Sequence, residues 1–196
     1  MHYNPIVLPL INGHMYVDLG LPSGTKWATM NIGASSETDY GNYYQYGKGA
    51  ATYQETSGQS AYNKTENPLA ASADTATQTW GDEWHMPTLA QIRELIANTS
   101  SQWVTNYNGS GVNGRKFTAQ NGNVLFLPAC GSYYSGTLSN LNTYGYYWGS
   151  GYATSTNSEY SLAFDDYAYD LYFSSSYCLD QYSKYKTGLP IRPVSD

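Results

Sequence analysis

The chain has 196 residues, a net charge of −6 and only 12% charged residues, and its nine basic residues are scattered, with Arg115–Lys116 as the longest run. Nucleic acids and anionic membrane surfaces are bound by clustered Lys and Arg, so this composition argues against both as partners. No apolar run approaches the roughly 20 residues of a membrane-spanning helix, so we expect no membrane insertion.

The N-terminal part of the chain is predicted to mix strands with irregular connections. Residues 1–13 are expected to form a lead-in segment and residues 14–196 a single domain, because no linker or internal repeat divides them. Alternating apolar and polar residues predict strands over 15–19 and 26–32. Ser36 precedes a weaker helix predicted over 37–46, which Gly41 interrupts. The polar stretch 52–79 is predicted to be an extended loop.

One helix is well specified by local signals. Thr88 is a cap residue, and Gln91 three positions later completes a capping box. Leu89, Ile92, Leu95 and Ile96 then recur at helical spacing and form one apolar stripe. The sequence therefore predicts a helix that begins after Thr88 and ends near Asn98.

The rest of the chain is predicted to consist of short strands. Asn121 and Gly122 lie between two alternating runs and predict a hairpin, because both tolerate the positive φ of a tight turn. The predicted strands cover residues 103–107, 115–119, 124–127, 146–149, 160–164, 170–173 and 189–194. A few helices followed by many strands indicate an α+β fold.

The C-terminal third has an unusual composition. Residues 132–187 contain 13 of the 22 tyrosines, together with 11 serines. Strand alternation predicts that Tyr160, Leu162 and Phe164 share one face, and that Leu171 and Phe173 point inward while Asp170 and Tyr172 point outward. We expect Tyr147 and Trp148 to be core residues. The candidates for an exposed, ligand-binding role are Tyr133, Tyr134, Tyr144, Tyr146, Tyr152, Tyr167, Tyr169, Asp170, Tyr172, Tyr177, Tyr182 and Tyr185.

Exposed tyrosines among Ser, Gly and Asp have the chemistry of an antibody paratope. Tyrosine supplies a large amphipathic contact area with few rotamers to fix, while Ser and Gly supply adaptable hydrogen bonding. Tyrosine is also a good strand former, so part of this enrichment is explained by a half-buried sheet. The combination favours a binding surface over a merely tyrosine-rich sheet.

Five motifs in order resemble a known bacterial family. They are YVDLGLPSG at residues 16–24 with KWAT at 26–29, WG at 80–81 with WHMPT at 84–88, NVLFLPACG at 123–131, GYYW at 145–148 and PIRPV at 190–194. Over residues 14–194 the chain resembles the major paralogous domain of Fibrobacter succinogenes, which is abundant in Bacteroides-type gut bacteria and their phages. The resemblance implies a C-type lectin-like fold, with one or two helices packed on short antiparallel strands and long loops.

Some members of this family resemble the variable proteins of diversity-generating retroelements, in which a reverse transcriptase rewrites C-terminal codons at adenines. The resemblance implies that residues 132–187 are a variable, ligand-binding region. Changes at the adenines of an Asn codon reach Tyr, Ser, Asp, Gly and Cys but not Trp, Gln, Glu, Lys or Met. Trp148, Glu159, Gln181, Lys184 and Lys186 are therefore expected to be fixed positions.

Two cysteines and three histidines limit the catalytic alternatives. Cys130 and Cys178 are either one disulfide or, more simply, two independent small apolar residues. The family's sulfatase-modifying branch implies an oxidase that uses cysteines and copper, but neither cysteine lies in a supporting motif. His85 directly precedes the helix cap and is expected to make a structural contact rather than serve a nucleophile.

Metal-dependent sugar binding has little support in the sequence. The tripeptides by which lectins of this fold hold calcium do not occur, and Asp165, Asp166 and Asp170 are expected to be exposed acids at strand ends rather than calcium ligands. We therefore expect a non-enzymatic binding module without a cofactor, extracellular on a phage virion or bacterial cell surface, whose partner is a protein or glycan receptor. The alternatives are a non-diversified surface module of the same family and a formylglycine-generating enzyme.

Overall fold

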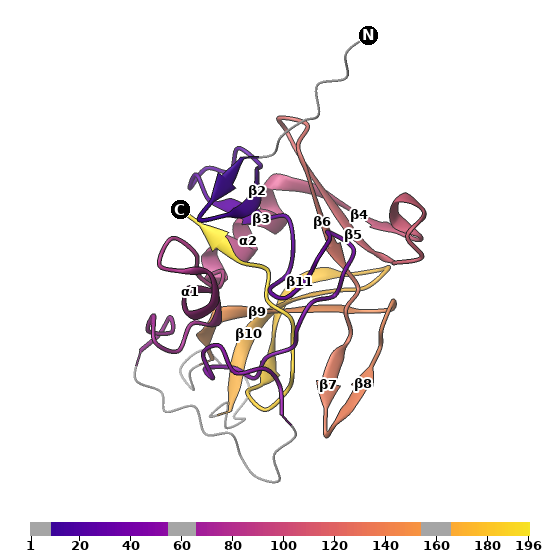
Figure 1. Ribbon diagram of the computed structural model, residues 1–196. Coiled ribbons are helices and arrows are strands. Elements are labelled where there is room, and N and C mark those ends of the chain that lie inside the picture. The colour runs from indigo at the N-terminus through magenta and orange to yellow at the C-terminus, as the bar shows by residue number, and fades with distance from the viewer. Residues whose placement is uncertain (1–8, 55–65, 154–165) are drawn as a thin grey trace.

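The computed structural model describes residues 9–54, 66–153 and 166–196 (Figure 1). Within these residues the regular structure is mostly antiparallel strand, with two short α-helices, and the fold class is α+β as predicted. The predicted strand over 160–164 lies outside the described residues. No helix in the described part of the chain is long and apolar enough to cross a membrane.

The first sheet joins the beginning of the domain to its C-terminal end. It has the order β1 (Leu10–Ile11), β2 (His14–Asp18), β3 (Lys26–Ala28) and β12 (Val194–Ser195). Val194 pairs with Trp27, so the last strand lies beside one of the first (Figure 1). The predicted strands over 15–19 and 26–32 are confirmed in position, although β3 ends at Ala28.

Two helices follow in the chain. The helix α1 (Thr75–Trp80) lies in the stretch predicted to be a loop, so that prediction is wrong there. Asp74 caps α1 by accepting a hydrogen bond from Thr77 N, and its carboxylate also accepts one from Met86 N. The helix α2 (Leu89–Asn98) has the predicted bounds, and the capping box of Thr88 and Gln91 is formed in both directions.

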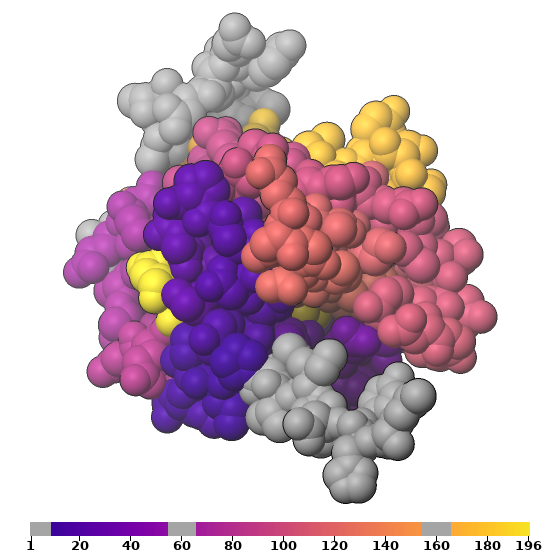
Figure 2. All heavy atoms as spheres, turned by 90° about the horizontal axis from the view of Figure 1, so that it is seen from above, coloured from indigo at the N-terminus to yellow at the C-terminus, as the bar shows by residue number. Residues whose placement is uncertain are grey.

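The second sheet begins where α2 ends. Its strands are β4 (Thr99–Val104), β5 (Gly114–Ala119) and β6 (Val124–Pro128), and the 3₁₀ turn η1 (Tyr107–Gly109) lies between β4 and β5. The β5–β6 hairpin was predicted, but only Gly122 of its turn pair has a positive φ, at 86°. Asn121 and Asn123 both donate to Asp18 O, which ties the hairpin turn to β2. In the view of Figure 2 the indigo N-terminal part of the described chain borders this hairpin.

The C-terminal part forms a hairpin and a third sheet. The hairpin is β7 (Ser132–Tyr134) with β8 (Thr137–Ser139). The sheet has the order β11 (Cys178–Lys184), β10 (Tyr167–Phe173), β9 (Gly145–Tyr152), all antiparallel. The strands β7, β8 and β11 were not predicted. Ile92 and Leu95 of α2 share a buried core with side chains on one face of this sheet, Tyr147, Leu171 and Phe173.

Two further predicted elements are wrong, one because of a close tertiary contact and the other because of two prolines. Residues 37–46 do not form a helix: Gly41 has a φ of 70°, and a Cβ at this position would lie 2.5 Å from Ile32 O. Residues 189–194 do not form one strand, because Pro190 and Pro193 have no N–H to donate to a ladder. That segment instead bonds piecewise, for example through Leu189 N to Tyr44 O.

Candidate functional site

The third sheet separates its tyrosines onto two faces. Residues that pair across neighbouring strands project from the same face of a sheet. Tyr146 pairs with Tyr172, which pairs with Leu179, and these three share one face. Tyr169 pairs with Tyr182 on the opposite face, beyond the part that α2 covers. The predicted tyrosines therefore do not form one continuous face.

A first group of rings consists of Tyr144, Tyr146 and Tyr172. Their centroids lie 5.2 Å apart for Tyr146 and Tyr172, 5.8 Å for Tyr144 and Tyr172, and 6.2 Å for Tyr144 and Tyr146. All three are half-buried, and burial raises the pKa of Tyr146 to about 12. The Tyr146 hydroxyl is therefore a neutral hydrogen-bonding group at neutral pH.

A second group lies on the opposite face and consists of Tyr167, Tyr169 and Tyr182. Tyr182 makes edge-to-face contacts with both others, at centroid distances of 6.0 Å and 6.3 Å. Lys184 Nζ stands 5.8 Å from the ring centroid of Tyr167. Tyr182 is one of the three predicted tyrosines that are exposed, with 45% of its surface accessible.

A third group lies around the β7–β8 hairpin. Tyr133 makes an edge-to-face contact with Tyr43 at 4.9 Å and stacks on Tyr53 at 5.3 Å. The next residue, Tyr134, is exposed, and Lys186 Nζ lies 4.9 Å from its ring centroid. Sequence reasoning missed Tyr43 and Tyr53, because they precede the tyrosine-rich third by about 80 residues. The cluster of aromatics at residues 40–53 was the available signal.

Two of the twelve predicted site residues are buried, so the prediction that they are exposed is wrong. Tyr185 is 1% exposed and stacks on Tyr46, and Asp170 is completely buried, so neither points outward as expected. The other ten retain accessible surface: Tyr134, Tyr177 and Tyr182 are exposed, and Tyr133, Tyr144, Tyr146, Tyr152, Tyr167, Tyr169 and Tyr172 are half-buried. Tyr147, Trp148, Leu171 and Phe173 are core residues, as predicted.

Asp170 is the chemically unusual member of the set. It lies on the central strand β10 between Trp148 and Gln181, and Gln181 Nε2 donates to its Oδ2 at 3.2 Å. Its Oδ1 is buried and has no hydrogen-bond partner among the described residues. Burial raises the pKa of this carboxyl to about 7, which the hydrogen bonds from Gln181 and Ser183 only partly oppose.

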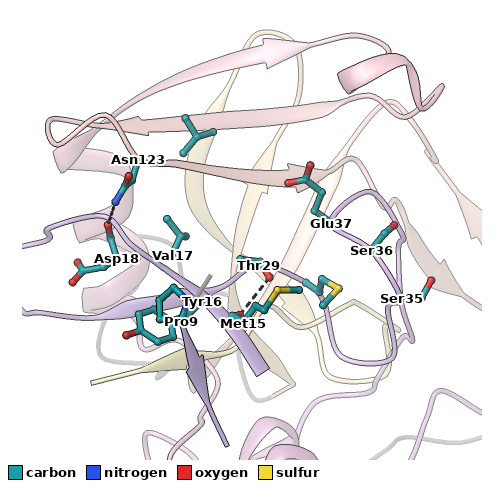
Figure 3. Close-up of a pocket in the computed structure, with 12 residues that line it drawn as sticks. Pro9, Met15, Tyr16, Val17, Asp18, Thr29, Ser35, Ser36, Glu37 and Asn123 are labelled. Carbon is teal, nitrogen blue, oxygen red and sulfur yellow. Dashed lines mark hydrogen bonds between the residues drawn. The ribbon is translucent and has the colours of Figure 1, made fainter. Parts of the chain in front are cut away.

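The clefts on the described surface include three of interest. The largest of these three, about 600 Å³, is lined by residues of β2, of segment 29–37 and of the β5–β6 hairpin, with Glu37 at its rim (Figure 3), and no predicted tyrosine lines it. A second, of about 310 Å³, lies between Tyr152, Tyr169 and the first turn of α2. The third, of about 430 Å³, is lined by Tyr43, Tyr53 and Tyr133 together with Gly41, Asn42 and Thr52.

The cysteines and His85, which were considered for catalysis, have the following surroundings. Cys130 and Cys178 are free thiols, and burial raises the pKa of Cys130 to about 12, far from a reactive thiolate. His85 is half-buried, with Nδ1 2.9 Å from Met86 O and Nε2 3.4 Å from Asp196. Among the described residues no group of three or more His, Cys, Asp or Glu is placed to hold a metal ion.

Comparisons do not assign the chain to a family. No family model, no curated protein and no solved structure matches it.

Proposed function

We propose that the chain is a binding module whose partner is a protein or glycan receptor, and that its tyrosine groups make the contact. One observation carries this proposal: ten of the twelve predicted residues keep accessible surface, and most of them lie in ring-to-ring groups. Rings that already pack against one another lose little side-chain freedom when a partner binds. Such rigid aromatic anchors are typical of binding hot spots.

The finer parts of the proposal come from the resemblance. The domain is proposed to have a C-type lectin-like fold, which two short helices and long irregular connections between antiparallel strands support. We place the protein outside the cell, on a phage virion or bacterial surface. We propose no enzymatic activity, and the buried thiol of Cys130 supports this over a formylglycine-generating enzyme.

A binding experiment with variants of each group tests the proposed function. The probe is fluorescently labelled protein added to cells of a panel of Bacteroides-type gut bacteria, with binding measured by flow cytometry. Three variants each disrupt one group: Tyr144→Ser with Tyr172→Ser, Tyr167→Ser with Tyr182→Ser, and Tyr133→Ser with Tyr134→Ser. We expect at least one variant to raise the half-saturating concentration about thirtyfold, because a hot-spot side chain contributes about 2 kcal/mol.

The control for this experiment removes exposed apolar surface elsewhere. Leu10 and Val124 are 58% and 38% exposed and lie away from the tyrosine groups, near the largest cleft. Leu10→Ser with Val124→Ser is expected to leave binding unchanged. Binding to no strain, or equal losses in the control and in all three tyrosine variants, contradicts the proposed function.

Diversification of the C-terminal region is a separate proposal with its own test. Tyr182 and Lys184 are both exposed on the same face of β11, so the structure tolerates substitution equally at the two positions. A mechanism that rewrites adenines of Asn codons reaches Tyr182 but not Lys184. Sequencing related loci is expected to show many substitutions at Tyr182 and few at Lys184. Equal frequencies at the two positions would leave the region as an ordinary, non-diversified surface.

A further inference from the structure

The cleft beside the β7–β8 hairpin has walls made of three tyrosine rings. Tyr133 is central, in contact with Tyr43 on one side and with Tyr53 on the other. The cleft volume, about 430 Å³, falls in the range of roughly 300–1,000 Å³ that small-molecule sites occupy. The cleft is therefore large enough to accept a small ring-shaped group against aromatic faces.

The rings that form these walls are held in place before any ligand arrives. The Tyr43 hydroxyl donates to Cys130 O at 2.5 Å, and the Tyr53 hydroxyl accepts from Gly136 N at 3.1 Å. The backbone of Tyr133 exchanges two hydrogen bonds of 2.9 Å with Gly188. A Cβ at Gly188 would lie 2.7 Å from the Tyr53 ring, so glycine is needed there for the ring to pack closely.

The lining of the cleft carries no formal charge. Its residues are Gly41, Asn42, Tyr43, Thr52, Tyr53 and Tyr133. A phosphate or carboxylate ligand is normally met by a positive charge, and none lines this cleft. A neutral ligand with both an apolar face and polar edges matches this lining.

Two exposed polar side chains at the cleft provide hydrogen bonds. The Asn42 amide nitrogen is directed to the Tyr44 hydroxyl at 3.4 Å, which leaves its carbonyl oxygen as a free acceptor. The Thr52 hydroxyl has no hydrogen-bond partner among the described residues. A sugar hydroxyl can donate to the first and exchange a bond with the second. A proline-rich peptide also stacks on aromatic rings, but proline has no N–H to donate.

We propose that the cleft between Tyr43, Tyr53 and Tyr133 binds one neutral sugar ring of a glycan. The C–H face of the sugar packs on the tyrosine rings, and its hydroxyls bond to Asn42 and Thr52. This proposal rests on the proposed binding function and names the chemical class that one part of the surface recognises. It requires no metal ion, because the contacts come from aromatic faces and neutral polar groups.

Nuclear magnetic resonance of the full chain with labelled tyrosine rings tests the sugar subsite. The probes are the methyl glycosides of glucose, galactose, mannose and N-acetylglucosamine, with glucose 6-phosphate as an anionic probe and a proline-rich peptide as the competing ligand class. We expect at least one neutral glycoside to shift the ring signals of Tyr53 and Tyr133, with a dissociation constant of about 1 mM. Saturation transfer should reach the C–H protons of that sugar.

Matched variants locate the binding. Tyr133→Ala is expected to weaken the sugar at least tenfold, whereas Val124→Ala, which changes an exposed side chain outside this cleft, leaves it unchanged. Asn42→Ala and Thr52→Ala change exposed side chains, and each is expected to weaken binding about fivefold. These two variants keep the test valid if Tyr133→Ala fails to fold.

Several results overturn the sugar subsite. The first is that no neutral glycoside shifts the ring signals, and the second is that the anionic sugar binds more tightly than its neutral counterpart. The third is that only the peptide shifts the ring signals. The fourth is that Asn42→Ala and Thr52→Ala both leave sugar binding unchanged. None of these results removes binding to bacterial cells through the other tyrosine groups. Failure of the subsite is therefore distinguishable from failure of the proposed function.

Discussion

Replacing Asp170 with Asn is expected to stabilise the protein at neutral and alkaline pH and to flatten the pH dependence of its unfolding free energy. The carboxyl is fully buried, and burial raises its pKa from 3.8 to about 7. Between these two values the unfolded chain releases the proton while the folded chain keeps it. Stability therefore falls as the pH rises from about 4 to about 7 and is constant above that range.

The expected size of this effect follows from the shift in pKa. A shift of roughly three units corresponds to up to about 4 kcal/mol of lost stability at pH 8. Asp170→Asn removes the titration while its amide oxygen can still accept from Gln181 Nε2, the donor that Asp170 has now. Urea unfolding followed by circular dichroism at several pH values between 4 and 9 measures the difference.

A neighbouring carboxylate provides the control for this experiment. Asp180 is a partly exposed acid on β11 that pairs with Arg93 at 2.9 Å on the opposite face of the sheet. Asp180→Asn keeps the buried carboxyl, so the fall in stability between pH 4 and 7 should remain. An Asp170→Asn variant with the same fall as the parent chain would show that another group causes the pH dependence.

The prediction for Asp170 went wrong for a reason that alternation cannot reveal. Asp170 and Tyr172 do share a face, as the period of two requires. That face is partly open at Tyr172. Around Asp170 it is covered, because Tyr46 and Tyr185 belong to the same buried cluster as Trp148, the cross-strand partner of Asp170. The covering residues come from distant parts of the chain, so the sequence of β10 alone carries no sign of them.

Elements with local signals were predictable, and elements held by tertiary contacts were not. The capping box at Thr88 and the apolar stripe of α2 lie within ten residues, and its bounds were predicted correctly. Helix α1 has no apolar stripe of that kind, and its cap Asp74 is tied to Met86 N, a contact outside the helix. The same limit applies to the tyrosine cleft, because Tyr53 and Tyr133 meet only in the folded chain.

Arg192 is the residue whose loss we expect to destabilise the fold most. It is 1% exposed, and its guanidinium donates to Asn31 Oδ1 at 2.7 Å, to Thr29 O at 2.8 Å and to Ala28 O at 3.1 Å. No carboxylate of the described residues forms an ion pair with it, and burial lowers its pKa. The charge is therefore stabilised mainly by these neutral acceptors.

Replacing Arg192 with Ala is expected to lower the free energy of unfolding by about 3–5 kcal/mol. Two buried acceptors and one half-buried acceptor lose their donor, and each unpaired buried group costs about 1–3 kcal/mol before water enters the space. The segment between Pro190 and Pro193 forms only isolated backbone bonds to this region, from Ala28 N to Pro193 O at 2.9 Å and from Ile32 N to Ile191 O at 3.1 Å. The three Arg192 bonds add to these two. Urea unfolding measures the loss, and the C-terminal strand is expected to lose amide protection first.

Two further substitutions separate the hydrogen bonds of Arg192 from its packing. Arg192→Met keeps much of the volume and removes the buried charge together with its donors. Arg192→Lys keeps the charge but replaces the planar fork with a single ammonium. If the bonds to Asn31, Ala28 and Thr29 dominate, both variants lose at least about 2 kcal/mol. A methionine variant as stable as the parent chain would contradict this. It would mean that packing, together with removal of the desolvated charge, offsets the loss of the three bonds.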